Sequence, residues 1–296
     1  MVKFPVLFLL AVVLLFSCDN GNDTPPFFST TYTIDDSSLG KVPVDTTGPY
    51  TEGSIVTVLN IAEIYTDELF FAGWSDGENS YYPNDTFIMG TEDVELKAQW
   101  AEKKVEDIDG NSYNTIKTGN QIWMAENLKT ITLNDGSPIQ KAEENSVWES
   151  MTAPAYCWYS NDSVAYNDYG LLYNGYTINT DKLCPVGWHV PSTEDWEDLA
   201  SYLGGNEIAG GKLKEQDFEH WKQPNTGATN ETGFTALPGG NRTESGFFQF
   251  GADLGFWWCT VYEDELANYH LFSNSSILSN SAAGLKDGLS VRCIKD

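Results

Sequence analysis

The alternation of hydrophobic and polar positions predicts strands in the first third of the chain. Residues 94–100 place Val, Leu, Ala and Trp between Glu, Lys and Gln, and this period of two is typical of a strand with one buried face. Two further runs of β-branched and aromatic residues, 54–59 and 70–74, predict two more strands. Pro83-Asn84-Asp85 predicts a turn. This part of the chain is expected to be a small β-module.

The last two thirds contain one clear helical pattern. Ser192 can cap a helix, and Asp195 stands in the reciprocal position of a capping box. One apolar face then follows with helical spacing: Trp196, Leu199, Ala200 and Leu203. Gly204-Gly205 predicts the end of the helix. Short strand-like runs at 121–125, 256–260 and 289–294 are separated by long Asn, Gly and Ser loops, so we expect an α+β fold with much irregular chain.

The N-terminus has the pattern of an export signal. Lys3 precedes an apolar run of 13 residues from Phe4 to Phe16, which is shorter than the roughly 20 residues that a membrane-spanning helix needs. The ending Leu15-Phe16-Ser17-Cys18 resembles a lipobox, which implies removal of residues 1–17 and acylation of Cys18, with palmitate as a typical acyl chain. Residues 19–26 are polar or turn-forming, and we therefore expect residues 18–27 to form a flexible tether. We therefore expect a lipoprotein of the cell envelope, in the outer membrane and exposed at the cell surface.

The charge of the chain limits its partners. It has 43 acidic and 16 basic residues, a net charge of −27. Nucleic acid and bare anionic lipid would be repelled by such a chain. Neutral glycans, cations and basic proteins are compatible with it. We therefore expect contact with the membrane through the N-terminal lipid alone, and an extracellular glycan or surface protein as partner.

Residues 28–101 resemble the Listeria–Bacteroides repeat, the internalin B-type module. The positions that carry the resemblance are Gly40 to Asp45, Tyr50, Gly53, Val56 to Val58, Gly73-Trp74, Tyr82, Phe87 to Gly90 and Val94 to Trp100. The resemblance implies a β-grasp-like fold, and a role as a spacer or an adhesion module. A single copy favours the spacer, which would hold the following domain away from the membrane.

Residues 102–296 resemble the Fibrobacter succinogenes major paralogous domain. The motifs are Asp107 to Tyr113, Gly119 to Leu128, Asp135-Gly136, Tyr156 to Tyr159, Tyr169 to Asn174, Cys184 to Ser192, Pro224 to Glu231, Leu237 to Gly240 and Ser290 to Cys293. Cys259 and Gly175 depart from the residues usual at their positions. The resemblance implies a C-type-lectin-like domain with long loops, in the branch that contains formylglycine-generating enzyme. That scaffold hosts binding proteins as well as enzymes.

The same resemblance implies a disulfide between Cys184 and Cys293, because such folds bring these two parts of the domain together. An exported chain is compatible with disulfides. Whether Cys157 and Cys259 also pair is left open. The catalytic alternative is that Cys259 and Cys293 bind copper as a thiol pair, as in formylglycine-generating enzyme, but the close cysteine-containing segment of that enzyme is not reproduced.

The candidate ligand-binding residues lie in one loop-rich stretch. They combine a Trp ring with amides and charges suited to sugar rings and hydroxyls: Trp221, Gln223, Asn225, Asn230, Glu231, Asn241 and Arg242. Gln223-Pro224-Asn225 looks like a calcium-dependent sugar motif, but it also belongs to the loop pattern of the family. His189, His220 and His270 show no metal-ligand spacing, so neither a metal nor another cofactor is predicted.

These observations lead to one expectation and two alternatives. We expect a surface lipoprotein that presents a recognition domain on a β-rich spacer, binds an extracellular glycan or protein, and is not an enzyme. The first alternative is a structural or assembly component of the cell envelope without glycan binding. The second is an oxidoreductase of the formylglycine-generating type.

Overall fold

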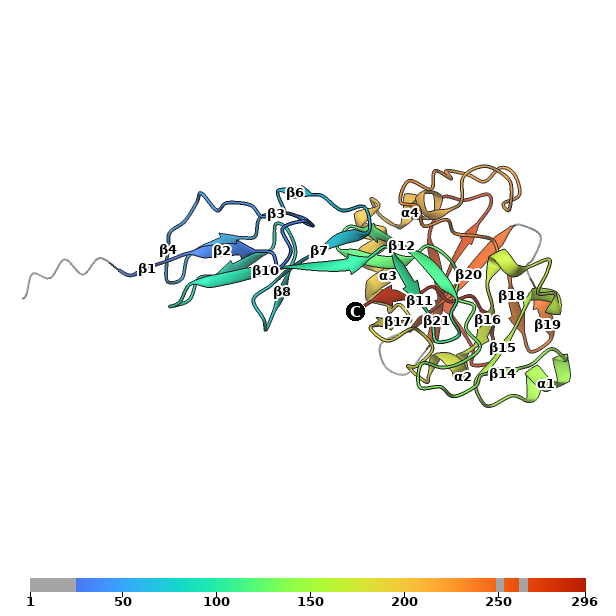
Figure 1. Cartoon of the computed structure of the whole chain (residues 1–296). Helices are drawn as coiled ribbons and strands as arrows, with labels where there is room; N and C mark the ends of the chain where they lie inside the picture. The colour runs from blue at the N-terminus through green and yellow to red at the C-terminus, as the bar shows by residue number, and fades with distance from the viewer. Residues whose placement is uncertain (1–24, 249–252, 261–265) are drawn as a thin grey trace, which may run out of the picture.

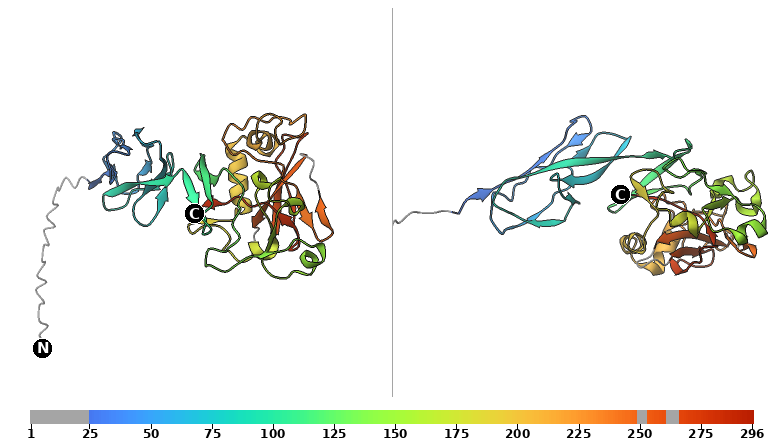
Figure 2. Two further views of the ribbon diagram at one scale, coloured as in Figure 1. Left: turned by 45° about the vertical axis from the view of Figure 1, so that its right-hand side comes forward. Right: turned by 90° about the horizontal axis from the view of Figure 1, so that it is seen from below.

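The computed structural model describes residues 25–248, 253–260 and 266–296. Residues 1–17, Cys18 and the first part of the tether, to which the export and acylation predictions refer, lie outside these ranges. The described chain forms an elongated N-terminal module and a larger C-terminal domain that lie end to end (Figures 1 and 2). Within the described ranges, no helix is both long and apolar enough to cross a membrane.

The N-terminal module is built on a four-stranded sheet. Its order is β2 (Thr30–Thr33), β10 (Val94–Glu102), β7 (Leu69–Ser75) and β8 (Ser80–Tyr81). Three two-stranded sheets flank it, and their strands are β1 (Phe27–Phe28) with β4 (Tyr50–Thr51), β3 (Gly40–Lys41) with β6 (Glu63–Ile64), and β5 (Ile55–Thr57) with β9 (Thr86–Ile88). β2 is parallel to β10, whereas β7 is antiparallel to it. The three predicted strands are thus present as β5, β7 and β10.

The core of the N-terminal module is aromatic. Trp74 is fully buried, and the centroids of the Tyr32 and Phe71 rings lie 4.8 Å and 4.9 Å from the centroid of its ring. The Trp74 indole nitrogen donates a hydrogen bond to the Leu59 carbonyl at 2.8 Å. Edge-to-face packing of this kind adds to the stabilisation from area burial alone. One Trp therefore connects the main sheet to the loop that follows β5.

The described residues of the C-terminal domain form three curved sheets. The first has the order β11 (Lys104–Glu106), β12 (Ser112–Thr118), β13 (Gln121–Met124), β24 (Ile294–Lys295) and β17 (Trp188–His189). The second has the order β14 (Gln140–Lys141), β15 (Ala155–Cys157), β16 (Leu172–Asn174), β23 (Gly288–Leu289), β18 (Asn241–Thr243) and β19 (Gly246–Phe248). The third has the order β20 (Leu254–Thr260), β21 (Leu266–Phe272) and β22 (Ser279–Ala282).

Helices are few and short in the described residues. They are α1 (Asn145–Ser150), α2 (Gly175–Ile178), α3 (Thr193–Tyr202) and α4 (Asn206–Leu213), with 3₁₀ turns η1 (Tyr159–Asn161) and η2 (Asn167–Tyr169). α3 is the predicted helix, and Ser192 and Asp195 form the predicted capping box. Gly204 and Gly205 follow it with φ of 99° and 101°, a conformation that costs a glycine little.

The predicted fold class is wrong. We expected α+β, with a β-grasp-like module before a C-type-lectin-like domain, but the described chain is mostly β and the longest α-helix in it has ten residues. Many strands of the C-terminal domain have only two to four residues, too few to produce a period-two pattern. Such strands are stabilised by neighbours distant in sequence, and no local pattern reveals them.

The predicted strand at 289–294 is divided in the structure. Leu289 belongs to β23 in one sheet and Ile294 to β24 in another. Between them, the carbonyls of Ser290, Val291 and Cys293 accept hydrogen bonds from the amides of Trp258, Leu128 and Met124. The segment therefore connects sheets, although its alternating pattern resembles that of one strand.

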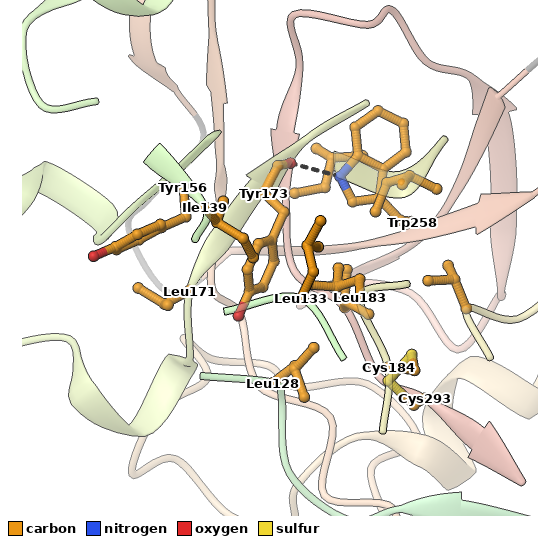
Figure 3. Packing of buried hydrophobic residues seen from close by; sticks show 14 of the residues in the cluster. Leu128, Leu133, Ile139, Tyr156, Leu171, Tyr173, Leu183, Cys184, Trp258 and Cys293 are labelled. Carbon is orange, nitrogen blue, oxygen red and sulfur yellow. Dashed lines mark hydrogen bonds between the residues drawn. A yellow bond between two sulfur atoms is a disulfide. The ribbon is translucent and has the colours of Figure 1, made fainter. Parts of the chain in front are cut away.

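Three buried clusters fill the described part of the C-terminal domain, and the two largest are rich in aromatic side chains. Trp258 belongs to the first, and its indole donates to the Tyr173 carbonyl at 2.7 Å (Figure 3). Trp257 belongs to the second, together with Trp196 of α3, whose ring stacks on Tyr269 at 5.0 Å. Both rings of the Trp pair are therefore core residues.

Three buried cations hold the loops of this domain. The Lys214 ammonium donates to the carbonyls of Phe272 and Ser275 at 3.0 Å and 2.9 Å. The Arg292 guanidinium donates to the Asn127 side chain at 2.9 Å and to the Phe234 carbonyl. Burial lowers the pKa of Lys214 to about 8 and that of Arg292 to about 9. The third buried cation is Arg242 of β18.

Candidate functional site

Two residues of the predicted binding group are internal. Trp221 is 1% exposed, and its indole donates to the Ala236 carbonyl at 2.7 Å. Asn225 is also buried, and its amide donates to the carbonyls of Glu215 and Asp217 at 2.9 Å and 2.7 Å. These side chains hold the loop that follows α4 in place. Neither has a surface on which a ligand could lie without rearrangement.

Arg242 of β18 is internal as well. Its guanidinium donates to the carbonyls of Ala142 and Glu143 at 2.6 Å and 2.8 Å. It lies between two aromatic rings, with its central carbon 4.6 Å from the Trp148 centroid and 4.7 Å from the Phe247 centroid. The protein itself therefore supplies the hydrogen-bonding and cation–π partners that a ligand would otherwise offer.

The remaining predicted residues are more exposed but mostly have protein partners. Asn230 accepts a hydrogen bond from the Thr235 amide at 2.7 Å. Glu231 forms an ion pair with Lys212 at 3.0 Å. Gln223 is exposed, and Asn241 is partly buried. The structure thus distributes the seven residues among different supporting contacts and does not bring them together around one opening.

A different group of side chains meets at the surface of the same loop. Glu215, Glu219 and His220 each offer a ligand atom, and these atoms lie within 4.8 Å of one another. The His220 Nδ1 is 2.8 Å and 2.9 Å from the two Glu215 oxygens. Neither Glu has a Lys or Arg within ion-pair distance in the described part of the chain. Among the described residues, the ion-pair partner of Glu215 is His220.

Two partly exposed tyrosines, Tyr169 of η2 and Tyr166 of the turn before it, continue this surface. The Tyr169 ring meets the His220 ring edge to face at 5.4 Å, and the Tyr166 ring lies 6.1 Å from the Tyr169 ring. Burial, followed by the charge of Glu215, raises the pKa of Tyr169. We call Tyr166, Tyr169, Glu215, Glu219 and His220 the tyrosine–carboxylate surface.

The chemistry of this surface suits two kinds of ligand. Partly exposed phenol rings beside carboxylates offer an apolar face together with hydrogen-bond acceptors, which matches a sugar ring and its hydroxyls. Two carboxylates and an imidazole also match the donor set of a divalent transition metal. These donors have the order Glu-x-x-x-Glu-His, which differs from the His-x-x-His and Glu-x-x-His spacings that predict a metal site, and the sequence therefore predicted no metal ligands here.

Comparison with known proteins decides the family. Residues 116–295 match the Fibrobacter succinogenes major domain. The chain belongs to this family. We use "major domain" below for the C-terminal domain. The match confirms the resemblance drawn from its sequence motifs.

Other comparisons add little detail. A putative Gly-rich membrane protein of Evansella cellulosilytica is 33% identical over 98 residues, which are 30% of this chain and 11% of that protein. The chain therefore corresponds to a small fraction of that relative's length. No solved structure matches the chain.

The major domain contains the disulfide that the resemblance implied. Cys184 and Cys293 are bonded, with their Cα atoms 6.0 Å apart and 109 positions apart in sequence. Figure 3 shows the bond at the edge of the first core cluster. Cys293 is therefore not available as the thiolate that a copper pair with Cys259 would need.

Cys157 and Cys259 do not pair. Both are buried free thiols, and they belong to different core clusters, one around β15 and one around β20. Burial raises the pKa of each thiol to about 11. A thiol held neutral in this way is a weak nucleophile at neutral pH.

His189 connects three elements of the major domain. Its Nδ1 lies 2.6 Å from a carboxylate oxygen of Asp296, and its Nε2 lies 3.3 Å from one of Asp195. Asp195 also accepts hydrogen bonds from the amide and hydroxyl of Ser192 at 2.7 Å and 2.6 Å. The imidazole thus joins the capping box of α3 to the C-terminal residue, which is a supporting role.

The sequence contained a signal for the tyrosine–carboxylate surface. Tyr159, Tyr166 and Tyr169 stand within a polar stretch that has few other large side chains. Aromatic residues in such a stretch have few apolar neighbours in sequence to pack against, and their rings instead meet one another. No local pattern shows, however, that Tyr166 and Tyr169 lie beside residues 215–220.

Proposed function

We propose that this protein is a lipid-anchored component of the cell envelope that presents its major domain to the extracellular space. The export and lipobox patterns around Cys18 support the anchor. The relative's name, which describes it as a membrane protein, supports an association with the envelope. On this proposal the N-terminal module, with its likeness to the Listeria–Bacteroides repeat, is the spacer and Cys18 holds the protein to the outer membrane.

The major domain binds a glycan at the tyrosine–carboxylate surface. The observation that carries this proposal is the meeting of the Tyr169 and His220 rings beside two carboxylates that lack a Lys or Arg partner in the described residues. Tyrosine rings stack on sugar rings, and carboxylates accept hydrogen bonds from hydroxyls. Uncompensated carboxylates disfavour polyanions, so the ligand class is a neutral or amino-sugar polysaccharide.

A glycan array, together with sedimentation on insoluble polysaccharides, tests the proposal. Tyr169→Ala removes a stacking ring, and Glu219→Gln removes one charge with little change of shape. Each is expected to weaken binding about tenfold, which corresponds to about 1.4 kcal/mol. Tyr65→Ala is the matched control, because this residue is 55% exposed and lies in the other module. Its affinity should equal that of the wild type.

The outcomes separate the remaining possibilities. If no glycan binds, either with Ca²⁺ or with a chelator, the glycan proposal is wrong and a protein partner or a structural role in envelope assembly takes its place. If binding is found but survives both substitutions, the ligand lies elsewhere on the major domain. If a chelator abolishes binding, a cation is part of the recognition.

The anchor needs a separate experiment. Metabolic labelling with a radioactive fatty acid should label the wild-type chain, and Cys18→Ser should remove the label. An antibody applied to intact cells should then detect the major domain. Absence of label from the wild type would contradict acylation, whereas labelled protein hidden from the antibody would place the anchor in a leaflet that faces the periplasm.

A further inference from the structure

One face of the N-terminal module exposes large apolar side chains. Ile55 and Ile88 are cross-strand partners on β5 and β9, and they are 67% and 63% exposed. Their neighbours Val56 and Phe87 pack against the small core cluster around Tyr50 and Met89. Because successive side chains of a strand point to opposite faces, the two isoleucines share the outward face.

Phe27 is a third exposed apolar residue at the same end of the module. It is 59% exposed and pairs with Thr51 in the β1–β4 ladder. Two backbone hydrogen bonds connect this ladder to the end of the β5–β9 ladder. The Gly53 amide donates to the Met89 carbonyl, and the Met89 amide donates to the Ser54 carbonyl. Figure 1 shows β1 and β4 at the end of the molecule opposite the major domain. We call Phe27, Ile55 and Ile88 the anchor-side face.

The length of the tether limits how far this face lies from the membrane. Phe27 is nine residues beyond Cys18, and nine extended residues span at most about 30 Å. If Cys18 is acylated, as the proposed function holds, Phe27 is the residue of the anchor-side face that is nearest to the bilayer in sequence. The major domain, joined to the other end of β10, is farthest away.

The neighbouring charges indicate which lipid surface this face suits. Glu52, Glu92 and Asp93 are exposed close to the ladders just described, and Asp93 accepts hydrogen bonds from the amide and hydroxyl of Ser29. Carboxylates are repelled by the negative potential of anionic lipid. Zwitterionic phospholipid presents no such barrier, and apolar side chains partition into its interface.

We propose that the anchor-side face inserts its side chains into the zwitterionic interface of the bilayer that holds the acylated Cys18. The inference rests on the proposed anchor and adds a second contact to it. A single flexible tether would let the module tilt freely, whereas lipid contact at Phe27, Ile55 and Ile88 fixes one end of the module against the membrane. The spacer then projects the major domain in a restricted range of directions.

A depth measurement tests the proposal with the full-length acylated protein in phosphatidylcholine vesicles. Thr86 is exposed and lies two residues before Ile88 on the same face of β9. A Thr86→Cys variant labelled with an environment-sensitive fluorophore reports the depth of this face and leaves all three apolar residues in place. The free thiols of Cys157 and Cys259 are buried and should not react in the folded protein.

Brominated lipid should quench and blue-shift the fluorophore at position 86. The same fluorophore in a Val186→Cys variant should be unaffected, because this position is 84% exposed in the major domain. Adding Ile55→Ser and Ile88→Ser to the Thr86→Cys variant should abolish the quenching. Both isoleucines are solvent-exposed, so the fold should survive, and unchanged circular dichroism confirms that it does.

Each result gives a decision. Protein that floats with the vesicles but shows no quenching at position 86 overturns the membrane contact and leaves the anchor intact. Protein that fails to float refutes the anchor, and the contact with it. Quenching that the two serines do not reduce assigns the proximity to the tether alone. If position 86 is shielded equally with and without lipid, a second copy of the chain covers this face instead.

Discussion

The two parts of this protein are stabilised in different ways. The N-terminal module packs small sheets around two clusters, and Trp74 is the largest buried side chain of the main one. The described part of the major domain has a disulfide, three buried clusters and the buried cations Lys214, Arg242 and Arg292. These cations donate mainly to backbone carbonyls of loops, and none forms an ion pair with a carboxylate among the described residues.

The difference follows from the kind of chain that each part must hold. In the module, longer strands such as β7 and β10 satisfy their own backbone groups. In the major domain, long loops leave carbonyls that need donors, and a guanidinium offers up to five. This strongly acidic protein thus buries three of its basic side chains. Each of them donates hydrogen bonds to loop carbonyls that no sheet satisfies. The following variants test this contrast.

The largest effect is expected for Arg292→Leu. The substitution leaves the Phe234 carbonyl and the Asn127 side chain without the donors that Arg292 provides. Each buried acceptor that is left without a donor costs about 1–3 kcal/mol. Hydrogen exchange measured on peptides should increase throughout the major domain and stay unchanged in residues 28–101. Equal loss of protection in both parts would show that they unfold as one unit.

Trp74→Ala is the reciprocal variant. It removes the central ring of the module and its hydrogen bond to Leu59, and a buried Trp-to-Ala change costs about 3–5 kcal/mol. Exchange should now increase in the module, while the major domain keeps its protection. Equal destabilisation of the major domain by this variant would show that the two parts are not stabilised separately.

Reduction of the disulfide is the third test. Opening the link between Cys184 and Cys293, which are 109 positions apart, should destabilise the major domain by about 2–5 kcal/mol. The Cys184→Ala/Cys293→Ala variant should show the same loss without reductant. The denaturation midpoint of the module should not respond to dithiothreitol, because the module has no cysteine.

The smallest effect concerns pH. Hydrogen bonding to Asp195, and then to Asp296, raises the pKa of His189 above its usual value. The folded protein therefore binds this proton more tightly than the unfolded chain. The resulting stabilisation is complete below the unfolded pKa of about 6.5 and is lost as pH rises through the folded pKa.

The size of this effect is limited by exposure. The His189 side chain is 44% exposed, so solvent screening should reduce the contribution to less than about 1 kcal/mol. His189→Gln should remove this part of the pH dependence in denaturant titrations between pH 6 and 8. Burial alone would raise the pKa of Asp195, but hydrogen bonds from His189 and Ser192 lower it below its usual value. The Asp195 carboxylate therefore stays ionised throughout that range.

Several elements could be predicted from sequence because their causes are local. α3 was predicted from the Ser192 cap, the four-residue apolar face and the glycines that follow. β7 and β10 were predicted from β-branched, aromatic and alternating residues. The family was recognised from motifs that the comparison confirms for residues 116–295.

The predicted binding group shows where local reasoning failed. Trp221 and Asn225 have the residue types of a sugar site, but the same types can hold a loop, and their burial shows that they do so here. His220, next to Trp221 in sequence, is partly exposed instead. Composition cannot distinguish the two roles, because the orientation of a loop side chain depends on what packs beneath it.

By itself, the sequence determined the strongly acidic character, the module order, the capped helix and the motifs of the major domain. Each of these depends on residues that are close together in the chain. Only the tertiary structure decided that Arg292 meets Phe234, that Cys157 and Cys259 stay apart, and that Tyr169 meets His220. The Tyr169–His220 contact joins residues 51 positions apart, and the Arg292–Phe234 contact joins residues 58 positions apart. Such pairs are set by how the short strands and loops pack together.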